Sequence, residues 1–266
     1  MLIIGEKINT TRKSMERAVR ERDEGLIRGE ALRQIEAGAQ TLDLNCGTLP
    51  AEVEPEALAW LVRIVQSGVA KPMCLDSPHP AALAAGLAVH EGKPMINSIS
   101  GERARYGQVL PLVKQYRAAV VALGMDDRGI PQDRQQALDV GQKLVSDLLS
   151  DGIPVDDIYF DPLVRSLATH QGTVIETLDG MRELASRFKG LHFVSGISNI
   201  SFGLPERRHI NRAFVVLSVA SGLDAVIVDP FDKTLLALIY AAEALTNRDR
   251  FCLKYIEAYR QGRLKP

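Results

Sequence analysis

The chain has 266 residues, of which 46% are hydrophobic and 24% charged, a composition typical of globular proteins with a large core. Its 32 basic and 33 acidic residues give a net charge of -1 without a long run of like charge, so nucleic acid is not expected as a partner. No segment approaches the roughly 20 consecutive apolar residues that cross a bilayer, and the start MLIIGEKINTTRK does not resemble a signal peptide. These features predict a cytoplasmic protein without membrane contact.

Cysteine and histidine spacing gives no sign of a metal centre. The three cysteines form no CxxC pair, and the five histidines form no HxH or HExxH pair. We therefore expect reduced thiols and no metal held by this chain.

Short apolar runs alternate eight times with longer segments of helical periodicity. In chain order, strands are predicted at 2–8, 41–46, 72–76, 94–98, 118–125, 157–162, 192–198 and 225–229. Helices are predicted at 28–37, 54–67, 80–90, 102–116, 132–149, 173–188, 210–220 and 233–244. Fully apolar runs such as VVAL and AVIV are typical of parallel strands covered by helices on both faces of a sheet.

This alternation predicts a single (β/α)₈ TIM barrel that occupies residues 1–266 as one domain. The alternative is a doubly wound open sheet. Its usual GxGxxG motif after the first strand is replaced here by Gly5-Glu6-Lys7-Ile8-Asn9, which favours the barrel.

In such a barrel the functional residues follow the carboxyl ends of the strands. The polar residues at these positions are mostly acids and amides: Asn9, Asp43, Asn45, Asp76, Asn97, Asp126, Asp161, Asn199 and Asp229. This set favours a neutral polar ring as ligand. It disfavours phosphate, because the eighth loop, Asp229-Pro230-Phe231-Asp232, is acidic.

A 2-amino-4-oxopteridine would suit these acids, because its adjacent N–H donors can pair with one buried carboxylate. Asp161 or Asp76 is the candidate acceptor. Taken singly, such residues could instead cap helices or shape turns, and Asn97 and Asn199 could be ordinary loop amides. Their joint position on one rim favours the ligand-binding interpretation.

Seven segments in these positions resemble the pterin-binding methyltransferase family, which includes the folate domain of cobalamin-dependent methionine synthase. They are LIIGEKIN at 2–9, LDLNCG at 42–47, CLDS at 74–77, MINSIS at 95–100, FDPLV at 160–164, GISNISFGLPERRHINRAF at 196–214 and GLDAVIVDP at 222–230. Their order and spacing extend the resemblance over nearly the whole chain.

The resemblance implies that Asp76, Asn97 and Asp161 hold the pterin ring. It also implies that Asn199 is the catalytic residue and faces nitrogen-5 of the folate, where the methyl group is attached. An amide there can stabilise developing charge, although it cannot itself supply a proton.

Three further residues receive roles from the same resemblance. Gly196 and Ser198 would line the same wall as Asn199, and Arg207 would contact the benzoyl-glutamate end of the folate.

The implied activity is methyl transfer, in either direction, between 5-methyltetrahydrofolate and the cobalt of a corrinoid. Because the chain contains no DxHxxG segment, the cobalamin would arrive on a separate corrinoid protein that docks transiently at the carboxyl rim of the barrel. A homodimer is also implied by the related barrels.

Two alternatives are a non-catalytic pterin-binding subunit and an enzyme similar to dihydropteroate synthase. The second is expected to carry Lys and Arg after strands seven and eight, where this chain has Ser198-Asn199 and Asp229-Pro230.

Overall fold

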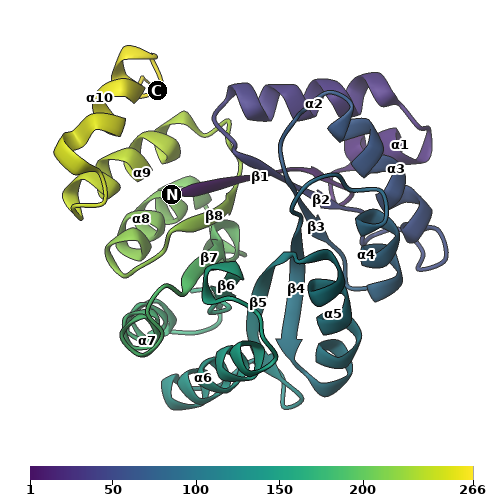
Figure 1. Cartoon of the computed structure of the whole chain (residues 1–266). Coiled ribbons are helices and arrows are strands. Elements are labelled where there is room, and N and C mark those ends of the chain that lie inside the picture. Colours follow the sequence, from purple (N-terminus) through teal and green to yellow (C-terminus); the bar gives the residue numbers. More distant parts are fainter. Residues whose placement is uncertain (266) are drawn as a thin grey trace.

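A computed structural model describes residues 1–265. Its eight parallel strands form a closed barrel in chain order, with β1 paired to β8 (Figure 1). The strands are β1 (Leu2–Asn9), β2 (Thr41–Asn45), β3 (Met73–Asp76), β4 (Met95–Gly101), β5 (Ala119–Asp126), β6 (Ile158–Asp161), β7 (His192–Gly196) and β8 (Ala225–Val228). The predicted TIM barrel is therefore confirmed, and each expected strand overlaps an observed one.

Helices cover the outside of the barrel, as Figure 1 shows. They are α1 (Lys13–Arg20), α2 (Glu24–Glu36), α3 (Glu54–Gln66), α4 (Pro80–Leu87), α5 (Arg103–Tyr116), α6 (Arg134–Ser150), α7 (Thr173–Arg187), α8 (Arg207–Ala220), α9 (Lys233–Leu245) and α10 (Leu253–Arg260). Three short 3₁₀ turns are η1 (Val155–Asp157), η2 (Ile197–Ser201) and η3 (Arg250–Cys252).

Two local predictions differ from the structure. The first helical segment begins earlier than expected, as α1 followed by α2, because the Asp23 side chain accepts a hydrogen bond from Leu26 N and starts a second helix. The seventh strand was expected to continue to Ser198, but it ends at Gly196. The chain then turns into η2, where Ile197 and Ile200 are buried three residues apart.

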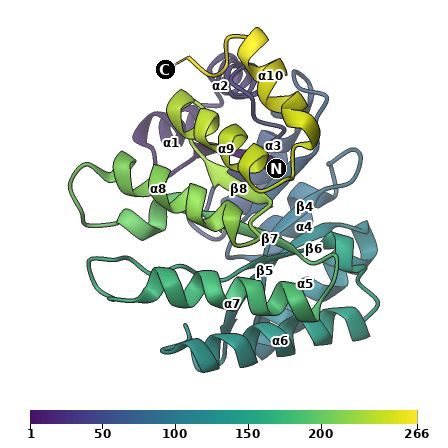
Figure 2. The ribbon, with the colours of Figure 1, turned by 90° about the vertical axis from the view of Figure 1, so that its left-hand side faces the viewer.

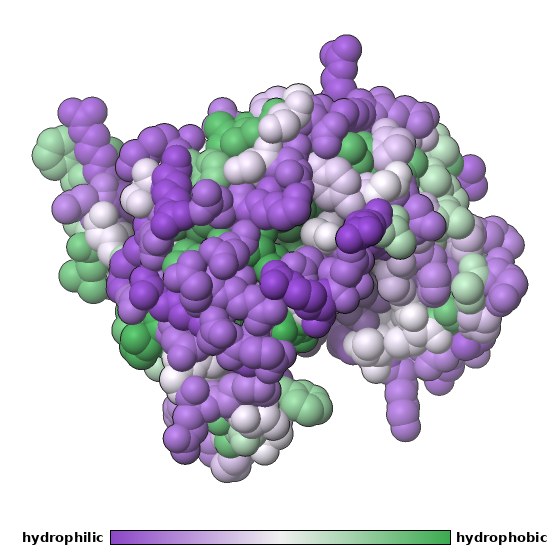
Figure 3. All heavy atoms as spheres, turned by 90° about the horizontal axis from the view of Figure 1, so that it is seen from below, coloured by the Kyte–Doolittle hydropathy of each residue, from purple (hydrophilic) through white to green (hydrophobic). Residues whose placement is uncertain are grey.

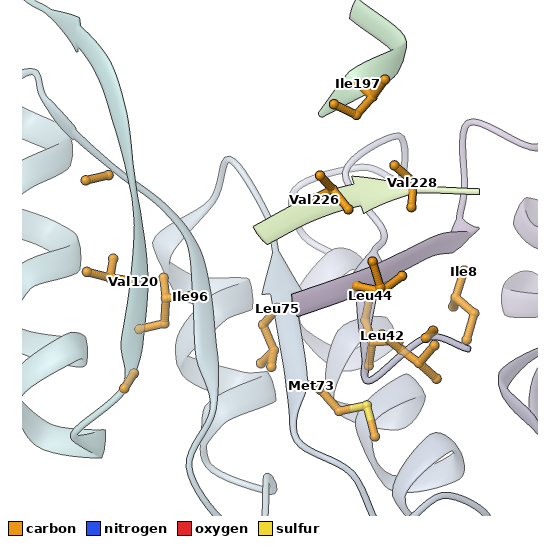
Figure 4. Packing of buried hydrophobic residues seen from close by; sticks show 14 of the residues in the cluster. Ile8, Leu42, Leu44, Met73, Leu75, Ile96, Val120, Ile197, Val226 and Val228 are labelled. Carbon is orange, nitrogen blue, oxygen red and sulfur yellow. The ribbon is translucent and has the colours of Figure 1, made fainter. Parts of the chain in front are cut away.

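Alternation of side chains along the strands separates the core into two layers. One face packs against the helices and includes Leu42 and Leu44 of β2 (Figure 4). The other face fills the barrel with a smaller cluster of buried residues: Ile4, Cys74, Met95, Val121, Val194 and Ala225. The same alternation directs every second residue near the strand ends towards the mouth of the barrel, which is where the polar candidates lie.

The carboxyl end of the barrel carries two protruding loops, one before α7 and one before α8, which extend side by side in Figure 2. Hydrogen bonds join them: Leu167 N donates to Ile200 O at 3.0 Å, and Ser166 Oγ donates to Phe202 O at 2.6 Å. The β6–α7 loop therefore supports η2 from outside the barrel.

Hydrophilic and apolar residues both lie on the outer surface. Hydrophilic residues cover much of the face seen from below in Figure 3, with apolar atoms in patches between them. Within residues 1–265, no helix is both long and apolar enough to cross a membrane.

Candidate active site

The ends of β2, β3 and β4 bring three polar side chains together. Parallel pairing places Asn45 beside Asp76, and Asp76 beside Asn97. Asn45 Nδ2 donates to Asp76 Oδ2 at 2.6 Å, while Asn45 Oδ1 accepts from Gly47 N at 2.9 Å. Asp76 and Asn97 also line one cavity of about 310 Å³. The structure thus places these two predicted residues next to each other.

A second carboxyl group, that of Asp43, lies beneath Asp76 and Asn97. Asp43 is 2% exposed, and burial raises its pKa well above the usual value, with a further contribution from the charge of Asp76. Burial also raises the pKa of Asp76, to about 6, although Asn45 and Arg105 oppose that shift. Burial therefore favours the protonated form of both acids, and the charge of Asp76 adds to the shift at Asp43.

We predict that Asn45→Ala raises the pKa of Asp76 above about 6, because it removes the hydrogen bond that lowers it. If ionised Asp76 contacts the ligand, affinity at pH 7 falls by about 3- to 30-fold, and much of the loss is recovered at higher pH, where Asp76 ionises again. Calorimetric titrations of folate across pH measure this effect. A loss that does not vary with pH would mean that Asn45 acts by packing alone.

Arg105 of α5 holds the loops around this cavity. Its guanidinium donates to three backbone oxygens: Ser98 O at 2.8 Å, Pro78 O at 2.6 Å and Ser77 O at 2.8 Å. It thereby joins the loop that follows β3 to Ser98 of β4. The sequence analysis placed Asn45 among the polar residues of the rim without a role, and it did not name Arg105. The period-two spacing of Asp43 and Asn45 was a usable signal for Asn45, whereas no sequence pattern pointed to Arg105.

Behind the β3–α4 loop, Glu54 is fully buried and bonded to two side chains. Ser77 Oγ donates to Glu54 Oε1 at 2.6 Å, and His79 Nδ1 pairs with Glu54 Oε2.

We predict that Ser77→Ala lowers the free energy of unfolding by about 1–3 kcal/mol, because it leaves a buried carboxylate oxygen without its donor. Urea denaturation measures this, and Ser186→Ala, at an exposed residue of α7, is the control. Equal stability of the two variants would contradict the prediction.

Asp161 lies at the end of β6 on the opposite side of the mouth and is 9% exposed. Its Oδ1 accepts from Leu163 N at 2.8 Å. Burial raises the pKa of Asp161 to about 6, against hydrogen bonds from the backbone of Leu163 and Gly196. Asp161 is therefore a buried acid in direct contact with the end of β7.

Gly196 contacts both Asp161 and Asn199. A Cβ at Gly196 would lie 3.6 Å from Nδ2 of Asn199, so the Asn199 amide packs over the glycine whose backbone bonds Asp161. Asn199 itself is exposed on η2. Within residues 1–265 its side chain has no hydrogen-bond partner, which leaves its amide free for a ligand.

Arg207 fixes η2 from the first turn of α8. Its Nη2 donates to Ser198 O at 2.6 Å, and its Nε donates to Ser201 Oγ at 3.0 Å. Ser198 and Arg207 line a second cavity, of about 420 Å³, together with Glu6 and Asp229. Burial raises the pKa of Glu6 to about 7, and the charge of Asp229 adds to the shift.

The predicted residues therefore fall into three neighbouring groups around one mouth. Asp76 and Asn97 line the first cavity, Ser198 and Arg207 line the second, and Asp161, Gly196 and Asn199 lie together. The two cavities are separate in the structure, and neither is lined by Asp161 or Asn199.

The closed barrel carries buried acids at its carboxyl rim, together with the Asn199 amide, an arrangement that suits a polar heterocycle. The comparison with known families agrees. Residues 5–229 match the family of pterin binding enzymes, and the chain belongs to this family. The expected resemblance is confirmed.

Two relatives extend this result. The chain is 36% identical, over its whole length and 98% of the relative, to the methylcorrinoid:tetrahydrofolate methyltransferase of Eubacterium limosum. It is also 32% identical to methionine synthase of Mycobacterium tuberculosis, over 86% of this chain and 20% of that protein.

Solved structures with the same fold are more distant in sequence. A dihydropteroate synthase from Xanthomonas albilineans, in complex with 7,8-dihydropteroate, matches with a TM-score of 0.68 and 22% identity, covering 93% of this chain and 92% of that one. A dihydropteroate synthetase with its product matches with a TM-score of 0.71 and 17% identity, covering 92% and 94%. At these identities the likeness concerns the fold.

Proposed function

We propose that this chain is a methyltransferase that moves a methyl group between nitrogen-5 of tetrahydrofolate and the cobalt of a corrinoid carried by a separate protein. The observation that carries the proposal is the 36% identity, along the whole chain, to a methyltransferase named for both substrates. The name of that relative describes transfer from methylcorrinoid to tetrahydrofolate. Because a catalyst lowers the barrier in both directions, either direction of transfer can be assayed.

The donors and acceptors at the mouth fit a pterin ring. Asp76 and Asp161 are ionisable acids with a pKa of about 6, so at neutral pH each can accept hydrogen bonds from ring N–H groups. Asn97 can donate to a ring oxygen or accept from a ring nitrogen. We assign ring binding to these three residues, with Gly196 and Ser198 lining the wall beside them and Arg207 contacting the benzoyl-glutamate end.

Asn199 is assigned to the reacting atom. A tertiary amine is a poor leaving group, so charge that develops on nitrogen-5 during transfer must be stabilised by a hydrogen bond or a proton. The free amide of Asn199 is held next to Gly196 by η2, which Arg207 fixes from outside. Such preorganisation lets Asn199 stabilise the transition state without first breaking a bond to the protein.

The corrinoid supplies a cobalt centre that accepts or donates the methyl group when its carrier docks at the carboxyl rim. The exposed position of Asn199 supports this arrangement, because nitrogen-5 would face outwards. We further propose a cytoplasmic, homodimeric enzyme whose one domain spans residues 1–266.

An absorbance assay tests the proposal. The purified protein, 5-methyltetrahydrofolate and cobalt(I) cobalamin are mixed, and formation of methylcobalamin is followed, with the reverse reaction run from methylcobalamin and tetrahydrofolate. We expect folate-dependent transfer that exceeds the protein-free rate. Folate binding without transfer, even with corrinoid proteins supplied, would identify a non-catalytic pterin-binding subunit. Absence of both would overturn the proposal.

A further inference from the structure

Phe202 is a large aromatic residue that the fold leaves in solvent beside the turn that carries Asn199. It is 71% exposed, more than Val53, Ile130 and Phe231, the other exposed large apolar residues of the loops at the carboxyl rim. Within residues 1–265 it belongs to neither cluster of the hydrophobic core, and it lines neither cavity at the mouth. Packing inside this protein therefore does not account for the ring.

The backbone of Phe202 is nevertheless fixed. Its N–H donates to Asn199 O at 3.2 Å, and its carbonyl oxygen accepts from Ser166 Oγ at 2.6 Å. The next residue, Gly203, has a φ of 81°, which favours glycine, and a Cβ there would lie 3.7 Å from Cβ of Ala168. The two loops that extend side by side in Figure 2 thus hold Phe202 at a set position relative to Asn199.

Single apolar residues are common on protein surfaces, so exposure alone does not define a contact site. The position of Phe202 is the second observation. It directly follows η2, and η2 carries the amide that we assign to nitrogen-5 of the folate. Whatever approaches nitrogen-5 from solvent therefore passes close to this ring.

The reaction places a second substrate there. In transfer from methylcorrinoid, the lone pair of nitrogen-5 forms the new N–C bond, the Co–C bond breaks with its electron pair left on cobalt, and nitrogen-5 loses its proton. Cobalt must therefore face nitrogen-5 across the methyl group. Because cobalt lies at the centre of the corrin macrocycle, the macrocycle extends sideways over the residues around Asn199. Its edge carries methyl groups, which an exposed phenylalanine ring can cover.

We propose that Phe202 packs against the corrin macrocycle and helps to place cobalt over nitrogen-5, an inference that rests on the proposed function. The contact is made with the corrinoid itself rather than with the polypeptide that carries it or with the folate. Burial of the ring then occurs only when the corrinoid has docked, and Phe202 is a binding residue for the second substrate.

Methyl transfer from free methylcobalamin to tetrahydrofolate tests this with the full chain. In Phe202→Ala we expect kcat/KM for methylcobalamin to fall about tenfold, since an apolar contact is lost, while folate affinity changes by less than about twofold. Phe202→Tyr keeps the ring and should stay within about threefold of the wild type. The matched control is Phe251→Ala in η3, beyond the end of α9, which removes a phenylalanine that is 78% exposed and should leave transfer unchanged.

A second measurement needs no turnover. Sedimentation of methylcobalamin with the protein, in the absence of folate, gives the affinity directly, and Phe202→Ala should weaken it by about tenfold. Methylcobinamide keeps the macrocycle but lacks the nucleotide, so it should show the same loss.

Equal kcat/KM and affinity in the wild type and Phe202→Ala would overturn the inference. A loss seen only with a methylated corrinoid protein would assign Phe202 to the polypeptide of the carrier, and a matching loss of folate affinity would assign it to the folate; either result makes the assignment to the macrocycle wrong. These outcomes leave the proposed function intact. A wild-type protein that transfers methyl from neither free nor protein-bound methylcorrinoid would refute the function itself.

Discussion

Replacement of Asn199 by alanine is expected to slow methyl transfer by about 10²–10³-fold, as loss of a preorganised donor does elsewhere, while folate affinity changes by less than about threefold. The rate should fall more than the affinity because of the position of the Asn199 side chain. The amide packs over Gly196 and has no hydrogen-bond partner within residues 1–265, so its removal breaks no bond that supports the fold. Single-turnover transfer at saturating folate measures the rate, and calorimetry measures the affinity.

The control is Gln135→Ala, which removes an exposed amide on α6 whose partner is Asp139. It should leave rate and affinity unchanged. Thermal unfolding of the Asn199 variant should match that of the wild type, which separates a catalytic loss from a structural one. If rate and affinity fell by the same factor, Asn199 would be a ground-state binding residue and the assigned role would be wrong.

The sequence predicted the carboxyl ends of β3 and β6 to within one residue because two signals coincide there. A buried strand such as MCLD or IYFD is apolar until its last residue, an aspartate, and parallel pairing then places neighbouring ends at one edge. Asp76 and Asn97 are adjacent for this reason alone. The family motifs assigned the roles of these residues, which spacing could not do.

What could not be predicted depends on contacts between distant segments. Lys7 and Asp229 are 222 positions apart, and their ion pair changes the charge of the eighth loop. Arg105 joins the β3–α4 loop to β4 through backbone oxygens, which leave no pattern in the sequence. The first two residues of η2, Ile197 and Ser198, were predicted as strand because Ile197 continues the apolar run of β7, and only packing reveals the bend.

Replacement of Asp161 by asparagine is expected to weaken folate binding by about 30- to 1,000-fold, which corresponds to about 2–4 kcal/mol. Each hydrogen bond from the ring to a carboxylate contributes about 1.5–3 kcal/mol, and the neutral amide accepts more weakly while its NH₂ group opposes a ring donor. The transfer rate at saturating folate should fall much less. Calorimetry and single-turnover kinetics measure the two effects, with Asp179→Asn on α7, an exposed acid that pairs with Arg182, as the matched control.

The same variant should stabilise the protein in the absence of folate. Burial raises the pKa of Asp161 from 3.8 to about 6, so the folded state holds the proton more tightly than the unfolded state does. The cost of ionisation is absent below pH 3.8, grows as pH rises and is complete above about pH 6, where two pKa units amount to about 3 kcal/mol. Urea denaturation at about pH 4.5 and about pH 7.5 should therefore show a stability gain from Asp161→Asn that is larger at the higher pH.

Together, the folate-binding and urea-denaturation measurements determine the role of the buried Asp161 carboxyl group. If the variant binds folate poorly but is more stable at neutral pH, the ionised Asp161 carboxylate lowers the stability of the ligand-free protein and strengthens folate binding. Weaker binding without a pH-dependent gain in stability would contradict the buried-charge explanation. Unchanged binding would remove Asp161 from the pterin site, and ring recognition would then depend on Asp76 and Asn97 across the mouth.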